Sequence, residues 1–349
     1  MSIEPMLGSP VVGTTIPMGS APQLASGVQA ASNRAGGQRV GNDRRARPFL
    51  KWAGGKRQLL PALREFYPGE FRTYHEPFLG SGAVFFDLAD SGALHPGRVR
   101  LTDVNADLIG CCLRLRDEPH AVIGYLRQLE AGYAAAPEEH YYRIRDEVFN
   151  PARAAITNGR HPRPEAYSPE LAGMLIYLNR TGYNGLFRLN SSGLFNVPRG
   201  RYKNPRICDE ENLRRVSSTL SALSAKMEHT SFDTVLRYAR AGDFIYFDPP
   251  YAPMSATAHF TSYTSDGFGG EDQRRLQQVM IELAKRKCSV LLSNSTAPDI
   301  AALYDGNADA ETAGLQAHKV PARRAINSNA SRRGPVLEYV ITNLPRRAV

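Results

Sequence analysis

Four consecutive residues carry the clearest chemistry in the chain: Asp248-Pro249-Pro250-Tyr251. They follow the apolar run 244–247, and in open α/β sheets ligands bind just beyond the carboxyl ends of the strands. Two prolines fix φ and cannot continue a ladder of hydrogen bonds, so we expect a stiff, extended corner. This corner offers a carboxylate, carbonyl acceptors and an aromatic face.

These groups suit a reaction at the exocyclic amino group of a nucleobase. That nitrogen is a poor nucleophile because its lone pair is delocalised into the ring. The Asp248 carboxylate and the Pro249 carbonyl can accept both N–H bonds and stabilise the positive charge that develops on the nitrogen. Tyr251 can stack on the base. The alternative is a strand that ends in a Pro-Pro turn with an incidental aspartate, but the order of the four residues favours catalysis.

A glycine turn precedes this corner, where residues 76–82 read EPFLGSG. Gly80 and Gly82 let the backbone approach a ligand closely at a strand-to-helix turn. Phe85 stands where the third glycine of G-x-G-x-x-G would be, which argues against a dinucleotide. Asp103 follows at the end of the next predicted strand, where an acidic group commonly holds ribose hydroxyls. A tight turn alone would explain the glycines, but together with Asp103 they predict an adenosine-containing cofactor without a pyrophosphate.

A second glycine-containing stretch, KWAGGK at residues 51–56, looks like half of a phosphate-binding loop. The motif G-x-x-x-x-G-K-[ST] needs a glycine where Leu50 stands and a hydroxyl where Arg57 stands. Both are missing, so we reject a nucleoside triphosphate site.

Residues 179–206 combine basic and aromatic side chains and contain no acidic residue. LFRLN, a turn at NSSG and LFNV predict a hairpin, and a two-stranded ribbon fits the major groove of DNA. A solvated basic hairpin without a role in recognition is the alternative. A second arginine-rich stretch, 321–335, suits phosphate contacts through Arg323 and Arg324, although a surface loop fits its composition nearly as well.

The elements that must position these groups alternate between apolar runs and helical patterns. Strands are expected near 73–76, 98–103, 243–247, 288–294 and 336–343. Helices are expected over 83–90, over 106–117 with Asn105 as N-cap, and over 271–286. This alternation predicts a parallel, doubly wound α/β sheet.

The segment 106–209 breaks that rhythm, with helical patterns, a polar loop over 150–170 and the hairpin. We interpret it as an inserted, mainly helical second domain between two parts of the core, 47–105 and 210–349. Residues 1–46, rich in Gly, Ala, Ser and Pro, are expected to form a flexible tail.

The composition of the chain indicates which classes of partner it could bind. The formal net charge of +9 favours an anionic partner, nucleic acid first and a membrane surface second. No stretch approaches the roughly 18 apolar residues of a membrane span. The four cysteines form no C-x-x-C pair and are expected to be reduced, mostly buried thiols. The histidines lack metal-ligand spacing, so we expect no metal.

Together these motifs, in this order, resemble the Dam-type, D12 class DNA adenine-N6 methyltransferases over about residues 47–344. The matching stretches are FLKWAGGKRQLLP, EPFLGSGAVF, LTDVNADLI, YLNRTGYNGLFRLNSSGLFNVPRGRYK, FDPPYAPMSATAHFTSY, LLSNS and RRAINSNASRRG. RRAINSNAS differs from the commoner form of the family at Ala325 and Ala330. The resemblance does not explain the tail or much of the 150–170 loop.

The resemblance implies a site-specific, adenine-specific DNA methyltransferase with S-adenosyl-L-methionine as cofactor. Its fold would be a Rossmann-like methyltransferase sheet with an inserted target-recognition domain that carries the hairpin. Its substrate would be a flipped adenine in duplex DNA, with GATC as the first expectation for the site. We expect a cytoplasmic, nucleoid-associated protein, a monomer or weak dimer, with no membrane and no metal.

It also implies roles for individual residues. The cofactor-binding residues would be Trp52, Lys56, Phe78, Gly80, Gly82, Asp103 and Asp248. Lys56 would pair with the cofactor's carboxylate, and Trp52 would cover an apolar or cationic face of it. The catalytic residues would be Asp248, Pro249, Pro250 and Tyr251. The DNA-binding residues would be Arg180, Tyr183, Asn184, Leu186, Arg188, Pro198, Arg201, Arg323 and Arg324.

Two alternatives stay open at this point. A catalytically silent DNA-binding protein could use the same scaffold, although Gly80, Gly82, Asp103 and the Asp248 corner are all present. Methylation of RNA or of a protein amide is the other alternative, because the catalytic strand alone does not exclude it.

Overall fold

A computed structural model describes residues 45–52, 54–252, 268–323 and 335–347, without the side chains of 323, 335 and 336. Its centre is a seven-stranded sheet in the order β5-β2-β1-β6-β7-β9-β8. The strands are β1 Tyr74–Glu76, β2 Val99–Asp103, β5 Lys226–His229, β6 Phe244–Phe247, β7 Ser289–Ser295, β8 Gln316–Arg323 and β9 Pro335–Thr342. The first five in this order are parallel, whereas β9 is antiparallel to both β7 and β8.

The order of the strands creates one switch point in the sheet. From β1 the chain passes through α2 (Ala83–Asp90) to β2 on one side, and from β6 it passes through α10 (Gly270–Lys285) to β7 on the other. Because β1 and β6 are neighbours, their crossovers diverge, and a crevice opens at the carboxyl ends of these two strands.

Strand β6 shows why the sheet is covered on both faces. Its side chains alternate, so Phe244 and Tyr246 belong to one buried cluster, and Ile245 and Phe247 to the other. The first cluster contains side chains of α2, and the second those of α10. A strand buried on both faces has a continuous apolar sequence, which is what 244–247 shows.

Two short elements precede β1, namely η1 Lys56–Gln58 and α1 Leu60–Arg64. Short helices that lie between later strands are η5 Phe232–Thr234, α9 Val235–Tyr238, α11 Pro298–Tyr304 and α12 Ala308–Thr312. None of the described helices is long and apolar enough to cross a membrane.

Several predicted elements are confirmed closely. The helix expected over 83–90 is α2, and that over 106–117 is α3 (Ala106–Asp117). Asn105 caps α3, since its side chain accepts a hydrogen bond of 3.0 Å from the N–H of Leu108. The helix expected over 271–286 is α10, and every predicted strand is present.

The prediction of a wholly parallel sheet is wrong at the C-terminal side. Only residues 324–334 connect β8 to β9, which is shorter than a parallel crossover needs. The edge strands β5 and β8 were not predicted, because neither has an apolar run. Pro321 within β8 fits an edge position, where a missing N–H costs the sheet nothing.

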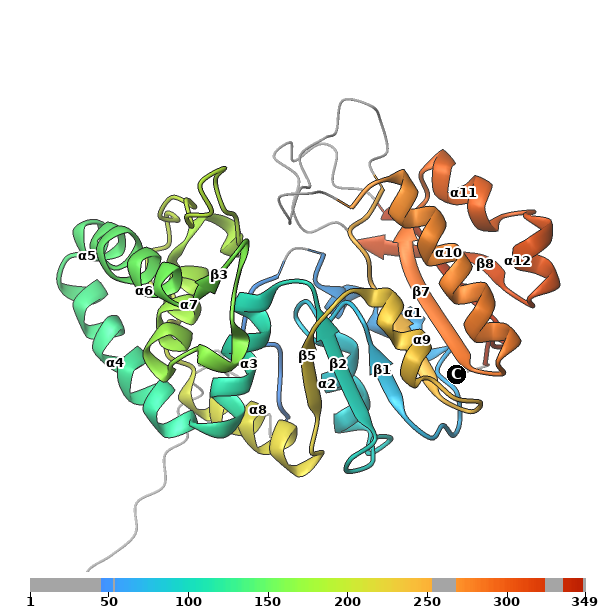
Figure 1. The fold of residues 1–349 in the computed structure, drawn as a ribbon, viewed down its shortest axis with the longest axis horizontal. Coiled ribbons are helices and arrows are strands. Elements are labelled where there is room, and N and C mark those ends of the chain that lie inside the picture. Colours follow the sequence, from blue (N-terminus) through green and yellow to red (C-terminus); the bar gives the residue numbers. More distant parts are fainter. Residues whose placement is uncertain (1–44, 53, 253–267, 324–334, 348–349) are drawn as a thin grey trace, which may run out of the picture. The chain divides into compact units, whose positions relative to one another are not determined.

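Between β2 and β5 the chain is mainly helical. After α3 come α4 Pro119–Ala135, α5 Pro137–Arg143, the π-helix η2 Ile144–Phe149, α6 Asn150–Ala155, α7 Pro169–Thr181 and α8 Glu210–Ala222. The helices α4 to α7 are grouped beyond the β5 edge of the sheet (Figure 1). Their buried apolar side chains are part of the same cluster as those of the sheet, so the described residues show no separate core for this segment.

The polar loop predicted over 150–170 is wrong in its first third. Residues 150–155 form α6, which continues directly from η2 and buries Asn150 and Arg153. The rest of this segment contains a two-stranded ribbon, β3 Thr157–Asn158 with β4 His161–Pro162, and the turn η3 Pro164–Ala166.

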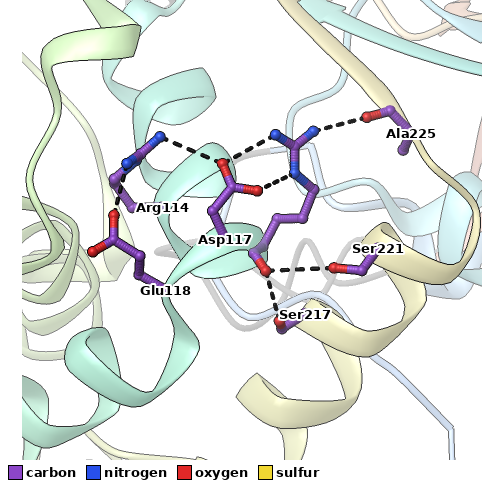
Figure 2. Close-up of polar contacts among 7 residues, drawn as sticks. Arg114, Asp117, Glu118, Ser217, Ser221 and Ala225 are labelled. Atoms are coloured by element: carbon purple, nitrogen blue, oxygen red, sulfur yellow. Dashed lines mark hydrogen bonds and ion pairs between the residues drawn. The ribbon is translucent and has the colours of Figure 1, made fainter.

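Polar contacts join the end of α3 to α8 where the chain returns to the sheet (Figure 2). The carbonyl oxygen of Arg116 accepts a hydrogen bond from Ser217 Oγ at 3.0 Å, and its guanidinium donates to the carbonyl of Ala225 at 3.1 Å. The Asp117 carboxylate accepts two hydrogen bonds from the same Arg116 guanidinium. These bonds fix α8, and therefore the start of β5, against α3.

Candidate active site

The switch point opens into a cavity of about 760 Å³. Its lining includes nearly all the residues predicted for catalysis and cofactor binding: Trp52, Lys56, Phe78, Gly80, Asp103, Asp248, Pro249, Pro250 and Tyr251. Gly82 is the exception. It begins α2 with a φ of 66° and lies against Leu79 and Phe86, behind the cavity.

The glycine turn is tied to the end of β2. Asp103 accepts a hydrogen bond from the N–H of Gly80 at 3.0 Å and another from the N–H of Asn105 at 2.8 Å. Gly80 has a φ of +46°, which favours glycine at this position. Burial raises the pKa of the Asp103 carboxyl. Its contact with a ribose stays a prediction, but the structure shows that it also shapes the turn.

Asp248 stands at the carboxyl end of β6 and is held on one oxygen. Lys56 Nζ lies 2.8 Å from Asp248 Oδ1, and Ser293 Oγ donates to the same oxygen at 3.3 Å. Neither contact engages Oδ2. Burial raises the pKa of the Asp248 carboxyl, and the Lys56 ammonium opposes that rise.

Lys56 is itself buried, with 6% of its side chain exposed. Its Nζ also donates to the carbonyl of Gly54 at 2.6 Å and lies 4.3 Å from the centre of the Tyr251 ring. The predicted pairing of Lys56 with a cofactor carboxylate stays a prediction. What the structure shows is a lysine whose main ionic partner is Asp248.

Side chains from neighbouring elements hold the Pro-Pro corner in place. Gln273 on α10 donates to the carbonyl of Pro250 at 3.1 Å, and Tyr251 Oη donates to Glu338 on β9 at 2.8 Å. Among the described residues none donates to the carbonyl of Pro249. Within the described part of the chain, this carbonyl and Asp248 Oδ2 are therefore two acceptors that remain available.

One wall of the cavity is aromatic. Phe78 stacks on Phe232 with ring centres 5.3 Å apart and meets Phe268 edge-on at 5.6 Å. Flat apolar walls of this kind suit a planar base. Phe232 was not predicted, because it follows the edge strand β5, which has no sequence signal of its own.

Three other residues near the site were also missed. His161 and His229 line the cavity with ring centres 5.2 Å apart, and His161 comes from the 150–170 loop that the resemblance leaves unexplained. Glu76 is buried beneath the glycine turn, where it accepts hydrogen bonds from Tyr74 Oη and from the N–H of Phe85. Burial raises its pKa well above the usual range. Its place inside the EPFLGSG motif was the only signal.

The basic segment forms an irregular hairpin. Its arms pair through two isolated antiparallel bridges, Gly182 with Arg199 and Leu189 with Phe195, and not through regular strands. The turn is closed by Asn190, whose N–H donates to the carbonyl of Leu194 at 2.9 Å. The predicted hairpin is thus confirmed in its path, but it lacks a continuous ladder.

Buried side chains from the preceding helices hold this hairpin by its backbone. The Asn150 amide donates to the carbonyl of Phe195 at 3.1 Å and accepts from its N–H at 2.9 Å. Arg153 donates to the carbonyl of Gly193 at 2.8 Å, and Tyr141 to that of Val197 at 2.9 Å. The helical segment therefore fixes the hairpin.

Most residues predicted to contact DNA lie on the surface of this hairpin. Those that are exposed are Tyr183, Asn184, Arg188, Pro198 and Arg201, and Leu186 is half-buried. Arg188 donates to Asn196 Oδ1 across the hairpin at 2.8 Å. Arg180 is only partly exposed, and burial lowers its pKa. Arg323 ends β8, while Arg324 lies outside the described residues, as do Ala325 and Ala330.

Comparison with known proteins agrees with this geometry. The sequence model of one protein family, the D12 class N6 adenine-specific DNA methyltransferases, matches residues 52–326. The chain therefore belongs to this family.

Its similarity to individual members extends over most of both chains. It is 37% identical over 297 residues to the type II methyltransferase M1.LlaDCHI of Lactococcus lactis subsp. cremoris, covering 85% of this chain and 95% of that one. It is 35% identical to the DNA adenine methylase of Vibrio cholerae serotype O1, covering 86% and 98%. The DNA adenine methylase of Escherichia coli (strain K12) is 34% identical, covering 86% and 96%.

Within the described residues, no group of three or more His, Cys, Asp or Glu side chains is placed to hold a metal ion. The four cysteines are free thiols; Cys111, Cys112 and Cys288 are buried and Cys208 partly so.

Proposed function

We propose that the protein transfers a methyl group from S-adenosyl-L-methionine to the N6 amino group of an adenine in duplex DNA, at a specific short site. The observation that carries this proposal is the pair of acceptors at the carboxyl end of β6. No donor from the described residues occupies Asp248 Oδ2 or the Pro249 carbonyl, and both residues line the cavity.

The cavity fits the cofactor in size and chemistry. About 760 Å³ is within the range of roughly 300–1,000 Å³ that is typical of small-molecule sites. The stacked rings of Phe78 and Phe232 suit an adenine, and Asp103 at the end of β2 suits a ribose. When bound, S-adenosyl-L-methionine would supply a sulfonium methyl group that an amino nitrogen can attack directly: the N–C bond would form as the S–C bond breaks, and the amino nitrogen would then lose one proton.

The residues of this chain would prepare the amino nitrogen for that attack. Its two N–H bonds point to Asp248 and to the carbonyl of Pro249, which favours a tetrahedral nitrogen and stabilises its developing positive charge. The Lys56 ammonium opposes the rise that burial causes in the pKa of Asp248, which favours the ionised carboxylate as the acceptor. Tyr251, fixed by Glu338, offers its ring for stacking.

The adenine must leave the duplex to reach this site, because its amino group is paired inside the base stack. Flipping costs a few kcal/mol, and stacking on Tyr251 at roughly 1–3 kcal/mol would offset much of it. We further propose that segment 106–209 is the target-recognition part and that its hairpin enters the major groove. GATC is the first site to test. The relatives named DNA adenine methylases support DNA as the substrate.

The test uses purified protein, S-adenosyl-L-methionine with a labelled methyl group, and duplex DNA, with RNA of the same sequence as the control. We expect labelled N6-methyladenine in the DNA only. Binding of S-adenosyl-L-methionine by calorimetry without any transfer would show a silent scaffold and would overturn the proposal. Label in the RNA at an equal rate would overturn the choice of substrate.

A further inference from the structure

One buried side chain attaches Lys51, which directly precedes the cavity-lining Trp52, to the basic hairpin. Asn179, near the end of α7, is 3% exposed. Its Oδ1 accepts from the N–H of Lys51 at 2.7 Å, and its Nδ2 donates to the carbonyl of Lys51 at 2.8 Å. The same Nδ2 donates to the carbonyl of Gly185 at 2.8 Å. One amide thus holds both backbone groups of Lys51 and the first turn of the hairpin.

The two segments are also in van der Waals contact at this point. Gly185 has a φ of +64°, and a Cβ added to it would come within 2.4 Å of Lys51 Cβ. The Lys51 ammonium donates to the carbonyl of Arg180 at 3.3 Å and lies 3.9 Å from the centre of the Tyr202 ring. Neither segment can shift here without moving the other.

Trp52, the next residue, contacts the hairpin and also lines the cavity. The Trp52 ring stacks on Phe187 of the hairpin, with ring centres 6.2 Å apart and planes 21° from parallel. Its other neighbour is the glycine turn, where a Cβ on Gly80 would lie 3.2 Å from Trp52 Cδ1. The N–H of Gly80 is in turn bound by Asp103. Packed groups therefore run without a gap from the hairpin to the predicted ribose contact.

We propose that Asn179 is a positioning residue that couples site recognition to cofactor binding, an inference that rests on the function proposed above. A hairpin seated on its correct site would hold residues 51–52 in the position that closes the cofactor pocket. By thermodynamic reciprocity, a bound cofactor would then hold the hairpin in the position that reads DNA. Because the amide orientation is fixed by a backbone N–H on one atom and two carbonyls on the other, no other side chain of similar size could replace it.

Asn150 provides a matched control within the same hairpin. It also holds the hairpin backbone with both atoms of a buried amide, but within the described residues both of these hydrogen bonds go to Phe195 and neither goes to Lys51. Asn150→Ala should therefore loosen the hairpin without breaking its attachment to Lys51.

The experiment measures the Kd of S-adenosyl-L-methionine by Trp52 fluorescence or calorimetry, alone and with a duplex that contains the mapped methylation site. For the wild type we expect the site to tighten cofactor binding at least about fivefold, the lower end of typical couplings. In Asn179→Ala this ratio should fall to about 1, whereas Asn150→Ala should keep the wild-type ratio and lose only DNA affinity. A thermal melt checks that each variant is folded.

Phe187→Leu is the second variant, because it keeps an apolar side chain but removes the ring that stacks on Trp52. It should lower the ratio in the same direction, and it makes the test available if Asn179→Ala does not fold. A wild-type ratio of 1, or a ratio that survives in the Asn179 or Phe187 variant, overturns the coupling while methyl transfer continues. A wild type that does not bind the cofactor at all instead overturns the proposed function.

Discussion

The carboxyl edge of the sheet and the basic hairpin are positioned by different means. Asp103 and Asp248 end strands that lie on either side of β1, so their placement follows from the backbone pairing of β1 with β2 and with β6. The hairpin has only two isolated bridges, and its backbone is held by individual side chains such as Asn150 and Arg153. A ladder between strands is held by many backbone hydrogen bonds, whereas the hairpin depends on a few buried side chains.

The largest effect of a substitution away from the cavity should therefore fall on the support of the hairpin. Arg153 binds both oxygens of Asp107 at 2.8 and 2.9 Å, and the two side chains are 4% and 3% exposed. Arg153→Met would leave Asp107 charged and buried. We expect a loss of about 3 to 5 kcal/mol in the free energy of unfolding, measured by urea titration.

The control for this loss is Arg114→Met. Arg114 pairs with Asp117, the last residue of α3, and with Glu118, which directly follows the helix (Figure 2). The Arg114 side chain is 22% exposed, and those of Asp117 and Glu118 are 37% and 45% exposed. Removing an exposed pair of this kind should cost less than about 1 kcal/mol. Equal losses in the two variants would contradict the view that the hairpin depends on a few buried groups.

At the sheet edge, substitution should affect chemistry and leave the fold intact. Asp248→Ala removes one of the two acceptors for the amino group, and we expect kcat to fall by about 10²- to 10³-fold or more. The β6 ladder remains and should preserve the fold, but the buried Lys56 loses its ionic partner, so the melting temperature should fall. A thermal melt checks that the variant is still folded. Substantial turnover in this variant would refute the assigned mechanism.

Arg188→Ala tests whether the hairpin reads bases. If Arg188 contacts a base edge, its loss should relax discrimination at one position by roughly 1–3 kcal/mol, measured as the ratio of kcat/KM for the site and for single-base variants. Arg201→Ala is the comparison, as another exposed arginine of the segment. An equal loss on all sequences would make Arg188 a phosphate contact only.

The smallest expected effect is a shift in pH dependence. Asp248 offers two acceptor oxygens and a negative charge only when it is ionised, so kcat should fall as pH falls through its pKa, which burial raises. The Lys56 ammonium lowers that pKa, and Lys56→Met should therefore move the acid limb of the kcat profile to higher pH. An unmoved limb would show that Lys56 does not tune the carboxylate.

Sequence patterns predicted mainly the strands and helices of the sheet, whose positions follow from backbone pairing. The apolar run 244–247, the Asn105 cap and the helices over 83–90 and 106–117 each carry their own local signal. The edge strands β5 and β8 carry no local signal and were not predicted. Phe232 follows β5 and was missed for the same reason, and only the fold brings it opposite Phe78. The contacts of Asn150, Arg153 and Asn179 could not be predicted either, because each joins residues far apart in sequence through a single side chain.

The most direct test of the whole account is to express the protein in a host without DNA methylation and map modified bases across the host DNA. We predict N6-methyladenine at nearly every copy of one short sequence, with GATC as the first expectation, and none in cells that express Asp248→Ala. Unmodified DNA, methylated cytosine, or methyladenine that persists with Asp248→Ala would contradict it.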